Sequence, residues 1–248
     1  MQRVELLAVP GLPMVKAGDD LASLIGERLI GELALRKGDV LVLAQKIVSK
    51  AEGRLVELAS VKPSPRAIEL GAEVQKDPRL VELILSESVR VVRSRPNVLI
   101  VEHKRGFVMA NAGIDQSNVA PQDGVERALL LPVDPDASAE ALRAGLGATA
   151  LLIIDSFGRP WRRGTTGVAI GSAGLPAMLD LRGNPDLFGR ILQVSISAFA
   201  DEIAAAASLV MGQGDEAQPV VLVRGLTWKA PANPASELVR PATEDLFR

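Results

Sequence analysis

Cysteine and tyrosine are absent from this 248-residue chain, and it contains a single histidine, His103. Without cysteine the protein has no disulfide, no Cys-ligated zinc or iron–sulfur cluster and no thiol nucleophile. One histidine excludes zinc sites built on two or three histidines. Aromatic residues make up 3% of the chain, which disfavours the stacking surfaces of proteins that bind single-stranded nucleic acid. The chemistry must therefore come from carboxylates, amides, hydroxyls, Lys and Arg, with any metal that these groups hold.

The charge balance and the hydrophobic runs exclude two further classes. The chain has 28 Lys and Arg against 30 Asp and Glu, a net charge of −2, so it lacks the basic field that duplex DNA or an anionic membrane requires. The N-terminal residues contain no apolar core of a signal peptide. The longest apolar runs fall far short of the roughly 20 residues of a bilayer helix. We therefore expect a cytoplasmic protein with no nucleic-acid or membrane partner.

Hydrophobic periodicity predicts strands and helices that alternate without a strict βαβ repeat, which favours an α+β fold. Strands are predicted at 4–9, 39–48, 89–92, 98–102, 148–154 and 219–223. Helices are predicted at 21–33, 64–75, 78–86, 136–146 and 201–211 from their spacing and capping residues. The Pro-rich tail, 231–241, is expected to pack as an irregular arm. The whole chain, 1–248, is interpreted as one module with room for two subdomains.

Familiar short motifs carry little function here. The sequence contains no P-loop. Gly145-Leu146-Gly147 follows a predicted helix and precedes a predicted strand, the reverse of the order that dinucleotide binding requires. Asp134-Pro135-Asp136 lacks the glycine and the distal glutamate of a calcium loop, so a helix cap is the favoured interpretation. His103 is interpreted as an edge histidine with satisfied hydrogen bonds rather than a catalytic one.

Three segments are harder to explain as structure alone. Residues 111–118 form a polar turn around Asp115. Asp155 and Ser156 are expected at the exit of the buried strand 148–154, followed by a Gly/Pro loop with three arginines, namely Arg159, Arg162 and Arg163. Residues 211–216 form a Gly-rich loop after a helix. Carboxylates and hydroxyls suit hard divalent cations, arginines suit phosphates or carboxylates, and Gly-rich loops let backbone N–H groups approach an anion.

Each of these residues also has a structural interpretation. Asp115 suits a turn in which an Asp side chain bonds its own backbone, Asp155 suits a cap, and the arginines suit a solvated surface. Taken singly, the structural interpretation is favoured for each. Taken together, two acids, a hydroxyl, several arginines and two Gly-rich loops favour a site for metal and phosphate.

At these residues the chain resembles the coenzyme F420-0:gamma-glutamyl ligases. The matching stretches are GLPMVKAGDDL (11–21), DVLVLAQKIVSKAEGR (39–54), NAGIDQSNV (111–119), DSFGRPWRRG and GVAIGSAGL (within 155–175), ADEIAAAASLVMGQG (200–214) and VVLVRGL (220–226). They span nearly the whole chain in order, which is far more specific than any one short motif.

The resemblance implies a GTP-dependent ligase that joins L-glutamate to the lactyl-phosphate tail of F420-0 through an amide and then adds gamma-linked glutamates. It implies two divalent cations per site, Mg²⁺ or Mn²⁺, with K⁺ as a further candidate. It also implies nucleotide binding without a P-loop and an intertwined α+β homodimer. Some relatives carry a nitroreductase-like domain, which we do not expect here.

Position by position, the resemblance assigns site residues. Metal ligands fall on Asp115, Asp155, Ser156 and Gln213. Guanine-nucleotide contacts fall on Leu12, Pro13, Met14, Val15, Gln45, Lys50, Asn118, Met211, Gly212, Gln213, Gly214, Asp215, Glu216, Ala217 and Gln218. Relatives can carry Glu in place of Gln213, Thr in place of Ser156 and a smaller hydroxyl residue in place of Gln45. A neutral Gln213 predicts a weaker second metal site.

The implied chemistry suits these residues. Phosphorylation of a carboxylate by GTP gives an acyl phosphate, from which phosphate leaves easily when an amine attacks. Asp115, Asp155 and Lys50 are interpreted as catalytic, because phosphoryl transfer depends on positioning and charge neutralisation. The three arginines are candidates for the F420 phosphodiester or the glutamate carboxylates. No residue identifies itself as the base that deprotonates the glutamate amine.

Two other functions stay open from the sequence. One is a metal-dependent phosphohydrolase that uses Asp115 and Asp155 with water as the acceptor. The other is a non-catalytic protein that binds nucleotide or F420, although the scarcity of aromatic residues disfavours stacking on a deazaflavin. Trp161 is interpreted as a packed loop anchor rather than a stacking residue.

Overall fold

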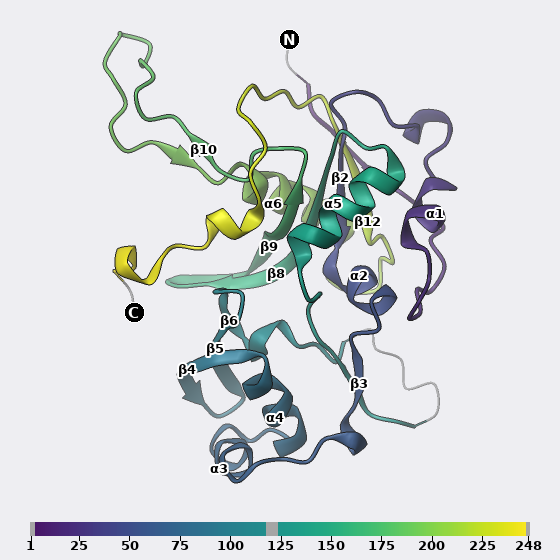
Figure 1. Ribbon diagram of the computed structural model, residues 1–248, viewed down its shortest axis with the longest axis vertical. Helices are drawn as coiled ribbons and strands as arrows, with labels where there is room; N and C mark the ends of the chain where they lie inside the picture. Colours follow the sequence, from purple (N-terminus) through teal and green to yellow (C-terminus); the bar gives the residue numbers. More distant parts are fainter. Residues whose placement is uncertain (1–2, 118–123, 247–248) are drawn as a thin grey trace.

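A five-stranded mixed sheet forms the centre of the molecule, with the strand order β1-β12-β2-β8-β9 (Figure 1). The computed structural model describes residues 3–117 and 124–246. The strands of this sheet are β1 (Glu5–Ala8), β12 (Val220–Arg224), β2 (Val40–Ala44), β8 (Ala150–Arg159) and β9 (Arg162–Ala173). β2 and β8 are parallel, and the other neighbouring strands are antiparallel. Central strands β2 and β12 are almost continuously apolar because both faces of the sheet are covered.

Helices cover the two faces of the sheet. On one face, α1 (Leu21–Gly26), α2 (Gln45–Ala51) and α5 (Pro135–Leu146) contribute to a core with Leu41, Leu151 and Ile153. On the other face, α6 (Phe199–Met211) packs against Val42 and Ile154. Alternate residues of each strand therefore belong to different cores, as the pleat of a β-strand requires.

Two glycines of β9 allow helices to approach the sheet closely. A Cβ atom on Gly171 would lie 2.2 Å from the carbonyl oxygen of Pro135, at the start of α5. A Cβ atom on Gly167 would lie 2.4 Å from the carbonyl oxygen of Ala204 in α6. Because both neighbours are backbone atoms, a larger residue at either position would force a helix away from the sheet.

The chain between α2 and α5 builds a further layer, which lies below the main sheet in Figure 1. Its strands form the sheets β4-β5-β6 and β3-β7, and two helices pack against them around Leu70, Ile84 and Leu99. These elements are β3 (Leu55–Glu57), α3 (Pro65–Val74), α4 (Pro78–Ser86), β4 (Ser88–Arg95), β5 (Val98–His103), β6 (Val108–Ala110) and β7 (Arg127–Leu129).

A two-stranded arm between β9 and α6 projects from the main body (Figure 1). Its base is the pair β10 (Leu179–Asp180) and β11 (Ile196–Ser197). The remaining described elements are short 3₁₀ turns: η1 (Gly31–Leu33), η2 (Leu58–Ser60), η3 (Asn111–Gly113), η4 (Ala235–Leu238) and η5 (Ala242–Glu244). Within residues 3–117 and 124–246, no helix is long and apolar enough to cross a membrane.

The α+β class predicted from the sequence is confirmed, and so are the helices with strong local signals. α3 and α4 begin behind Ser64 and Asp77, whose side chains accept backbone hydrogen bonds. Asp134 does the same for α5, so the cap interpretation of Asp134 is confirmed. Gly147 ends α5 in the left-handed conformation, φ 63°, which gives the Gly145–Gly147 segment a structural role. The Pro-rich tail is irregular, as its composition predicts, with the 3₁₀ turn η4 and an isolated bridge between Asn233 and Pro176.

Three sequence predictions are wrong. The predicted strand 39–48 ends at Ala44, where the chain turns into α2, because the apolar run continues from the sheet onto the buried face of a helix. The predicted helix 21–33 ends at Gly26, and residues 31–33 form a separate 3₁₀ turn. The predicted loop 155–164 is a long hairpin, since β8 continues to Arg159 and pairs with β9.

Candidate active site

Three segments predicted to contact nucleotide meet at one end of the main sheet. Residues 12–15 follow Val9, α2 follows Ala44, and residues 211–218 precede Pro219 at the start of β12. The backbone N–H groups of Val9 and Ala44 donate to carbonyl oxygens at the start of β12, 2.9 and 2.8 Å away. The antiparallel and parallel pairings of the sheet therefore bring together segments that are far apart in the sequence.

A strained turn positions Asp115 beside this end of the sheet. Three consecutive residues, Asn111, Ala112 and Gly113, have φ values of 54°, 54° and 70°. For a residue with a side chain this left-handed region costs about 1–2 kcal/mol. The backbone of Asp115 exchanges two hydrogen bonds with Leu129, of 3.0 and 2.8 Å, which hold the segment after the turn. Strain of this kind collects at functional sites, where the surrounding structure maintains it.

The Asp115 carboxylate is held by three donors. The backbone N–H and the hydroxyl of Ser117 donate to it over 2.6 and 3.0 Å, so Asp115 does form the turn that its structural interpretation predicts. Lys46 Nζ lies 2.7 Å from its Oδ2. Burial pulls the pKa of Asp115 upward, but the hydrogen bonds from Lys46 and Ser117 outweigh burial and hold the pKa below its ordinary value. Asp115 is therefore an ionised, oriented carboxylate.

The pKa of Asp155 is shifted in the opposite direction. It continues the face of β8 that carries Ile153 and Phe157, rather than following the end of the strand as the sequence predicted. Burial raises the pKa of Asp155 to about 6, and the negative charge of Asp115 adds to the rise. The backbone N–H of Ser156, the charge of Lys46 and the Gln45 side chain oppose it. The structure thus brings the two predicted catalytic carboxylates within electrostatic reach of each other.

Ser156 and Gln213 form a separate pair. Ser156 follows Asp155 on β8, so its side chain points to the opposite face, the face of Ile154 and α6. Its hydroxyl donates to Oε1 of Gln213 over 2.8 Å. The structure therefore associates the predicted metal ligands in two pairs, Asp115 with Asp155 and Ser156 with Gln213.

Two lysines of α2 face the site. Lys50 is half-buried, and burial lowers its pKa, with a further contribution from the charge of Lys46. Lys46 bridges Asp115 and the hydroxyl of Ser117, 2.9 Å away, and the sequence interpretation missed it. Lys46 and Lys50 are four residues apart, a spacing that places both on one face of a helix. This signal does not apply to a strand, and the sequence predicted a strand at 39–48.

The remaining nucleotide-contact residues differ in how accessible their side chains are. Val15 is buried in the core and Leu12 packs against that core, whereas the Met14 side chain is 67% exposed. Gln45 is only 1% exposed, so its side chain does not face an open surface. Asn118, the further predicted contact, lies outside the described residues.

The loop 211–218 folds around a carboxylate of its own. Gly212 has a φ of 72°, and a Cβ atom there would lie 2.0 Å from the carboxyl carbon of Glu216. The backbone N–H of Gly214 donates to Glu216 Oε2 over 2.8 Å. Backbone N–H groups of the loop, that of Glu216 itself first, lower the pKa of Glu216. The loop therefore presents N–H groups that can hold an anionic oxygen.

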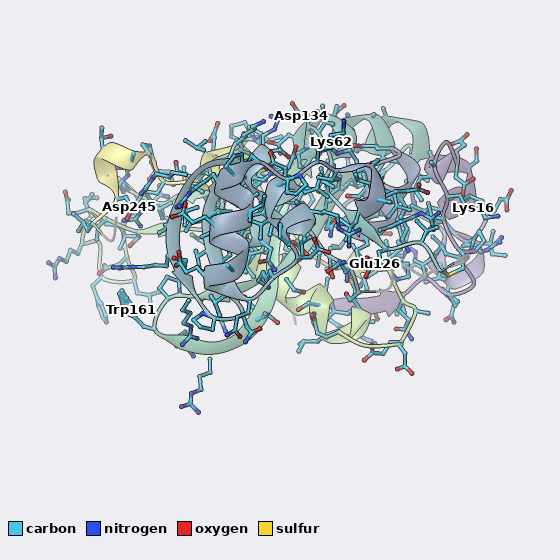
Figure 2. All side chains as sticks on the ribbon, turned by 90° about the horizontal axis from the view of Figure 1, so that it is seen from below. Lys16, Lys62, Glu126, Asp134, Trp161 and Asp245 are labelled. Atoms are coloured by element: carbon cyan, nitrogen blue, oxygen red, sulfur yellow. The ribbon has the colours of Figure 1, made fainter. Side chains whose placement is uncertain are left out.

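The three arginines lie away from the carboxylates. Arg159 and Arg162 pair across the tip of the β8–β9 hairpin, and all three guanidinium-bearing residues there are exposed. Arg159 is four residues beyond Asp155, roughly 13 Å along a strand. Trp161, at the same tip, is 73% exposed, so its interpretation as a packed anchor within this chain is wrong. Figure 2 shows Trp161 and Lys16 at opposite ends of the molecule.

His103 has a structural setting distinct from the site. It ends β5, which is the middle strand of its sheet and not an edge. Its Nδ1 accepts a hydrogen bond from the backbone N–H of Arg105, 3.0 Å away. Its Nε2 is buried, 3.8 Å from a carboxylate oxygen of Glu87, and has no hydrogen-bond partner among the described residues. The prediction of an edge histidine with all its hydrogen bonds satisfied is therefore wrong.

The donor set suits a cation that shares its coordination with a phosphate. Within the described part of the chain, no three Asp, Glu or His side chains gather as a metal cluster. Mg²⁺ commonly uses one or two carboxylates and completes its coordination with water and substrate phosphates. Asp115 and Asp155 match that pattern, and because both Asp115 oxygens accept hydrogen bonds from Ser117 or Lys46, a cation there would compete with these donors.

Comparison with known proteins gives consistent matches over the chain. The family model described as F420-0:Gamma-glutamyl ligase matches residues 11–225. A coenzyme F420:L-glutamate ligase of Methanothermobacter thermautotrophicus is 47% identical, with 99% of each chain covered. Proteins of the same name from Methanopyrus kandleri and Archaeoglobus fulgidus are 44% and 45% identical, with 97% and 99% of this chain and 96% and 97% of theirs covered.

Proposed function

The chain belongs to the F420-0:gamma-glutamyl ligase family and is a ligase, and we propose that it joins L-glutamate to coenzyme F420-0 in a reaction that consumes GTP and requires Mg²⁺ or Mn²⁺. In this proposal the first product carries an amide, and further glutamates are added through gamma-linkages. The names of the relatives support the substrates. The structure supports a site for phosphoryl transfer.

The observation that carries the proposal is the pair Asp115 and Asp155 at the end of the sheet where the nucleotide segments meet. One carboxylate is held ionised by Lys46, and the other is half-buried, with its pKa raised to about 6. Two close carboxylates in a partly enclosed site attract a divalent cation, because the cation relieves both their mutual repulsion and the cost of burial. A bound Mg²⁺ or Mn²⁺ would neutralise charge on the transferring phosphoryl group.

The proposed reaction has two steps that balance. A carboxylate oxygen of F420-0 attacks the gamma-phosphorus of GTP, the bond to the bridging oxygen breaks, and GDP leaves. The glutamate amine, having lost a proton, then attacks the acyl carbon, and inorganic phosphate leaves with the bond electrons. The N–H groups of the loop 211–218 and the ammonium group of Lys50 would orient the nucleotide phosphates, while Asp115 and Asp155 would hold the cation.

A second copy of the chain is part of the proposal. The arm between β10 and β11 carries Leu187, Phe188 and Val194, which are 98%, 95% and 85% exposed. Large apolar side chains in this number on a projecting hairpin indicate an interface. Trp161, on the tip of the other long hairpin, is also exposed. We propose that a homodimer covers the arm, in agreement with the intertwined dimer that the sequence resemblance implies.

The test follows atoms through the reaction. F420-0 labelled with heavy oxygen in its carboxylate is incubated with the protein, GTP, Mn²⁺ and L-glutamate, and the products are analysed by mass spectrometry. We expect GDP, phosphate and amide in equal amounts, with label in the phosphate, because the attacking oxygen becomes the bridge to phosphorus. Unlabelled phosphate would refute carboxylate phosphorylation. Phosphate release without F420-0 and glutamate would indicate a phosphohydrolase, and GTP binding with no GDP formed would indicate a binding protein.

A further inference from the structure

Gln45 lies beside Asp155 because of the parallel pairing of β2 and β8. Ala44, the last residue of β2, is opposite Ile154. Gln45 and Asp155 are the next residues on the two neighbouring chains. Gln45 begins α2, and its side chain is 1% exposed. It is therefore enclosed in the protein at the point where the candidate site meets the sheet.

Ser49 fixes the orientation of the Gln45 amide. It lies one helical turn later, is fully buried, and donates its hydroxyl hydrogen to Gln45 Oε1 over 2.8 Å. With the carbonyl oxygen held by Ser49, the NH₂ group is the end of the amide left to face Asp155, its neighbour beyond the β2–β8 pairing. A carboxylate accepts hydrogen bonds from an NH₂ group but not from a carbonyl, so this orientation is the favourable one.

The NH₂ group of Gln45 can still donate hydrogen bonds. Its Nε2 is buried and makes no hydrogen bond to any of the described residues. A buried donor without a partner costs roughly 1–3 kcal/mol, so each one calls for an explanation such as a catalytic role or a bound ion. Gln45 therefore combines a fixed carbonyl end with an unsatisfied donor next to a candidate metal ligand.

We propose that Gln45, held by Ser49, is a positioning residue that orients the Asp155 carboxylate for a divalent cation, and that its side chain does not contact the nucleotide. The inference rests on the metal role of Asp155 in the proposed function. Metal ligands are commonly oriented by hydrogen-bonding partners, and loss of such a partner weakens metal binding by roughly 10–100-fold. This assignment differs from the nucleotide contact that the sequence resemblance implies for Gln45.

Two variants separate the roles. Gln45→Met keeps the length and approximate volume of the side chain but removes the amide, and Ser49→Ala leaves the amide in place without its anchor. Ser172→Ala is the matched control, because Ser172 is also buried, lies on β9, and its hydroxyl has no hydrogen-bond partner among the described residues. Thermal unfolding establishes that each variant is folded. If Gln45→Met does not fold, Ser49→Ala still tests the inference.

Mn²⁺ affinity is measured by calorimetry on the nucleotide-free protein, and affinity for a fluorescent GDP analogue is measured at saturating Mn²⁺. We expect the Mn²⁺ dissociation constant to rise about tenfold or more in Gln45→Met and several-fold in Ser49→Ala. GDP affinity should stay unchanged, and Ser172→Ala should match the wild type in both measurements.

Weaker GDP binding with unchanged Mn²⁺ binding would overturn the inference and restore the nucleotide contact. Unchanged Mn²⁺ binding in both site variants would overturn it as well, while leaving the proposed function intact. A wild-type protein that binds no Mn²⁺, either alone or with GDP present, would refute the metal role of Asp155, and the inference with it.

Discussion

Replacement of Asp155 by asparagine is expected to stabilise the metal-free protein while it abolishes ligase activity. The pKa of Asp155 is raised to about 6 from an ordinary value of 3.8, chiefly by burial. A carboxyl group whose pKa is higher in the folded state contributes stability below pH 4 and loses this contribution as the pH rises through 6. At pH 8 the folded, metal-free protein therefore bears the cost of a buried charge, which an amide does not.

The size of the effect follows from that pKa. A tenfold change in an ionisation constant is worth about 1.4 kcal/mol, so the rise from 3.8 to about 6 corresponds to about 3 kcal/mol. Asp155 is partly exposed and its amide replacement must also be desolvated, so we expect a gain of roughly 1–3 kcal/mol at pH 8. For a chain of this length each kcal/mol moves the melting temperature by about 2–4 °C.

The assay is thermal unfolding in a chelator at pH 5 and at pH 8. Asp155→Asn should melt higher than the wild type at pH 8, and the difference should shrink at pH 5, where the wild-type carboxyl is largely protonated. Asp115→Asn is the control of opposite sign, because the pKa of Asp115 is lowered and its ionised form is stabilised by Lys46. If both variants lower the melting temperature equally at pH 8, the electrostatic difference between the two carboxylates does not exist.

Three further outcomes are expected. Asp115→Asn should lower kcat by about 100-fold or more, because it removes a charge that is proposed to hold the cation; retention of a tenth of the activity would exclude a metal ligand. Asp39→Ala should lower the free energy of unfolding by about 3–5 kcal/mol in urea titrations. The reason is that buried Asp39 accepts two hydrogen bonds from the Arg224 guanidinium, of 3.0 and 2.7 Å; a loss below 1 kcal/mol would contradict it. Phe188→Glu should shift the mass measured by light scattering from a dimer toward the 26.2 kDa monomer, and a wild type that is already monomeric would refute the dimer.

The sequence predicted elements whose signals are local. The helices behind Ser64 and Asp134 were predicted because the cap, the proline of the first turn and the apolar spacing occur within a few residues. The change from β2 to α2 at Gln45 was not predictable in this way. The apolar run passes through that point without a glycine, a proline or a capping side chain. Only the pairing of β2 with its neighbours shows where the strand ends.

The long β8–β9 hairpin was missed for a similar reason. Its distal half is rich in glycine, arginine and threonine, and proline follows Arg159, so local composition indicates a loop. Pairing of the two strands, which supplies the backbone hydrogen bonds, overrides that tendency. For the same reason Asp155 was predicted at the end of a strand, whereas it lies in the middle of β8.

The site was identified by residue type, but its electrostatics came from the fold. Asp115 and Asp155 were singled out because acids, amides and hydroxyls cluster around them in the sequence. Lys46 keeps Asp115 ionised, and the pKa of Asp155 is raised to about 6. Both states depend on which side chains α2 places near the two carboxylates. No sequence pattern specified Lys46, since its contact with Asp115 joins residues that are separated by nearly seventy positions.

The contrast between the two carboxylates would give the proposed metal binding a thermodynamic role in this protein. Lys46 satisfies Asp115, yet the same ammonium group only partly offsets the burial of Asp155. A divalent cation between the carboxylates would satisfy Asp155 as well, and would compete with Lys46 for Asp115. Metal binding would then remove the free-energy cost of burying the Asp155 charge. The metal should therefore stabilise the fold more than it would stabilise a protein that binds it through two exposed carboxylates. Displacement of Lys46 would at the same time release an ammonium group beside Lys50, at the end of the sheet where the nucleotide phosphates are proposed to lie.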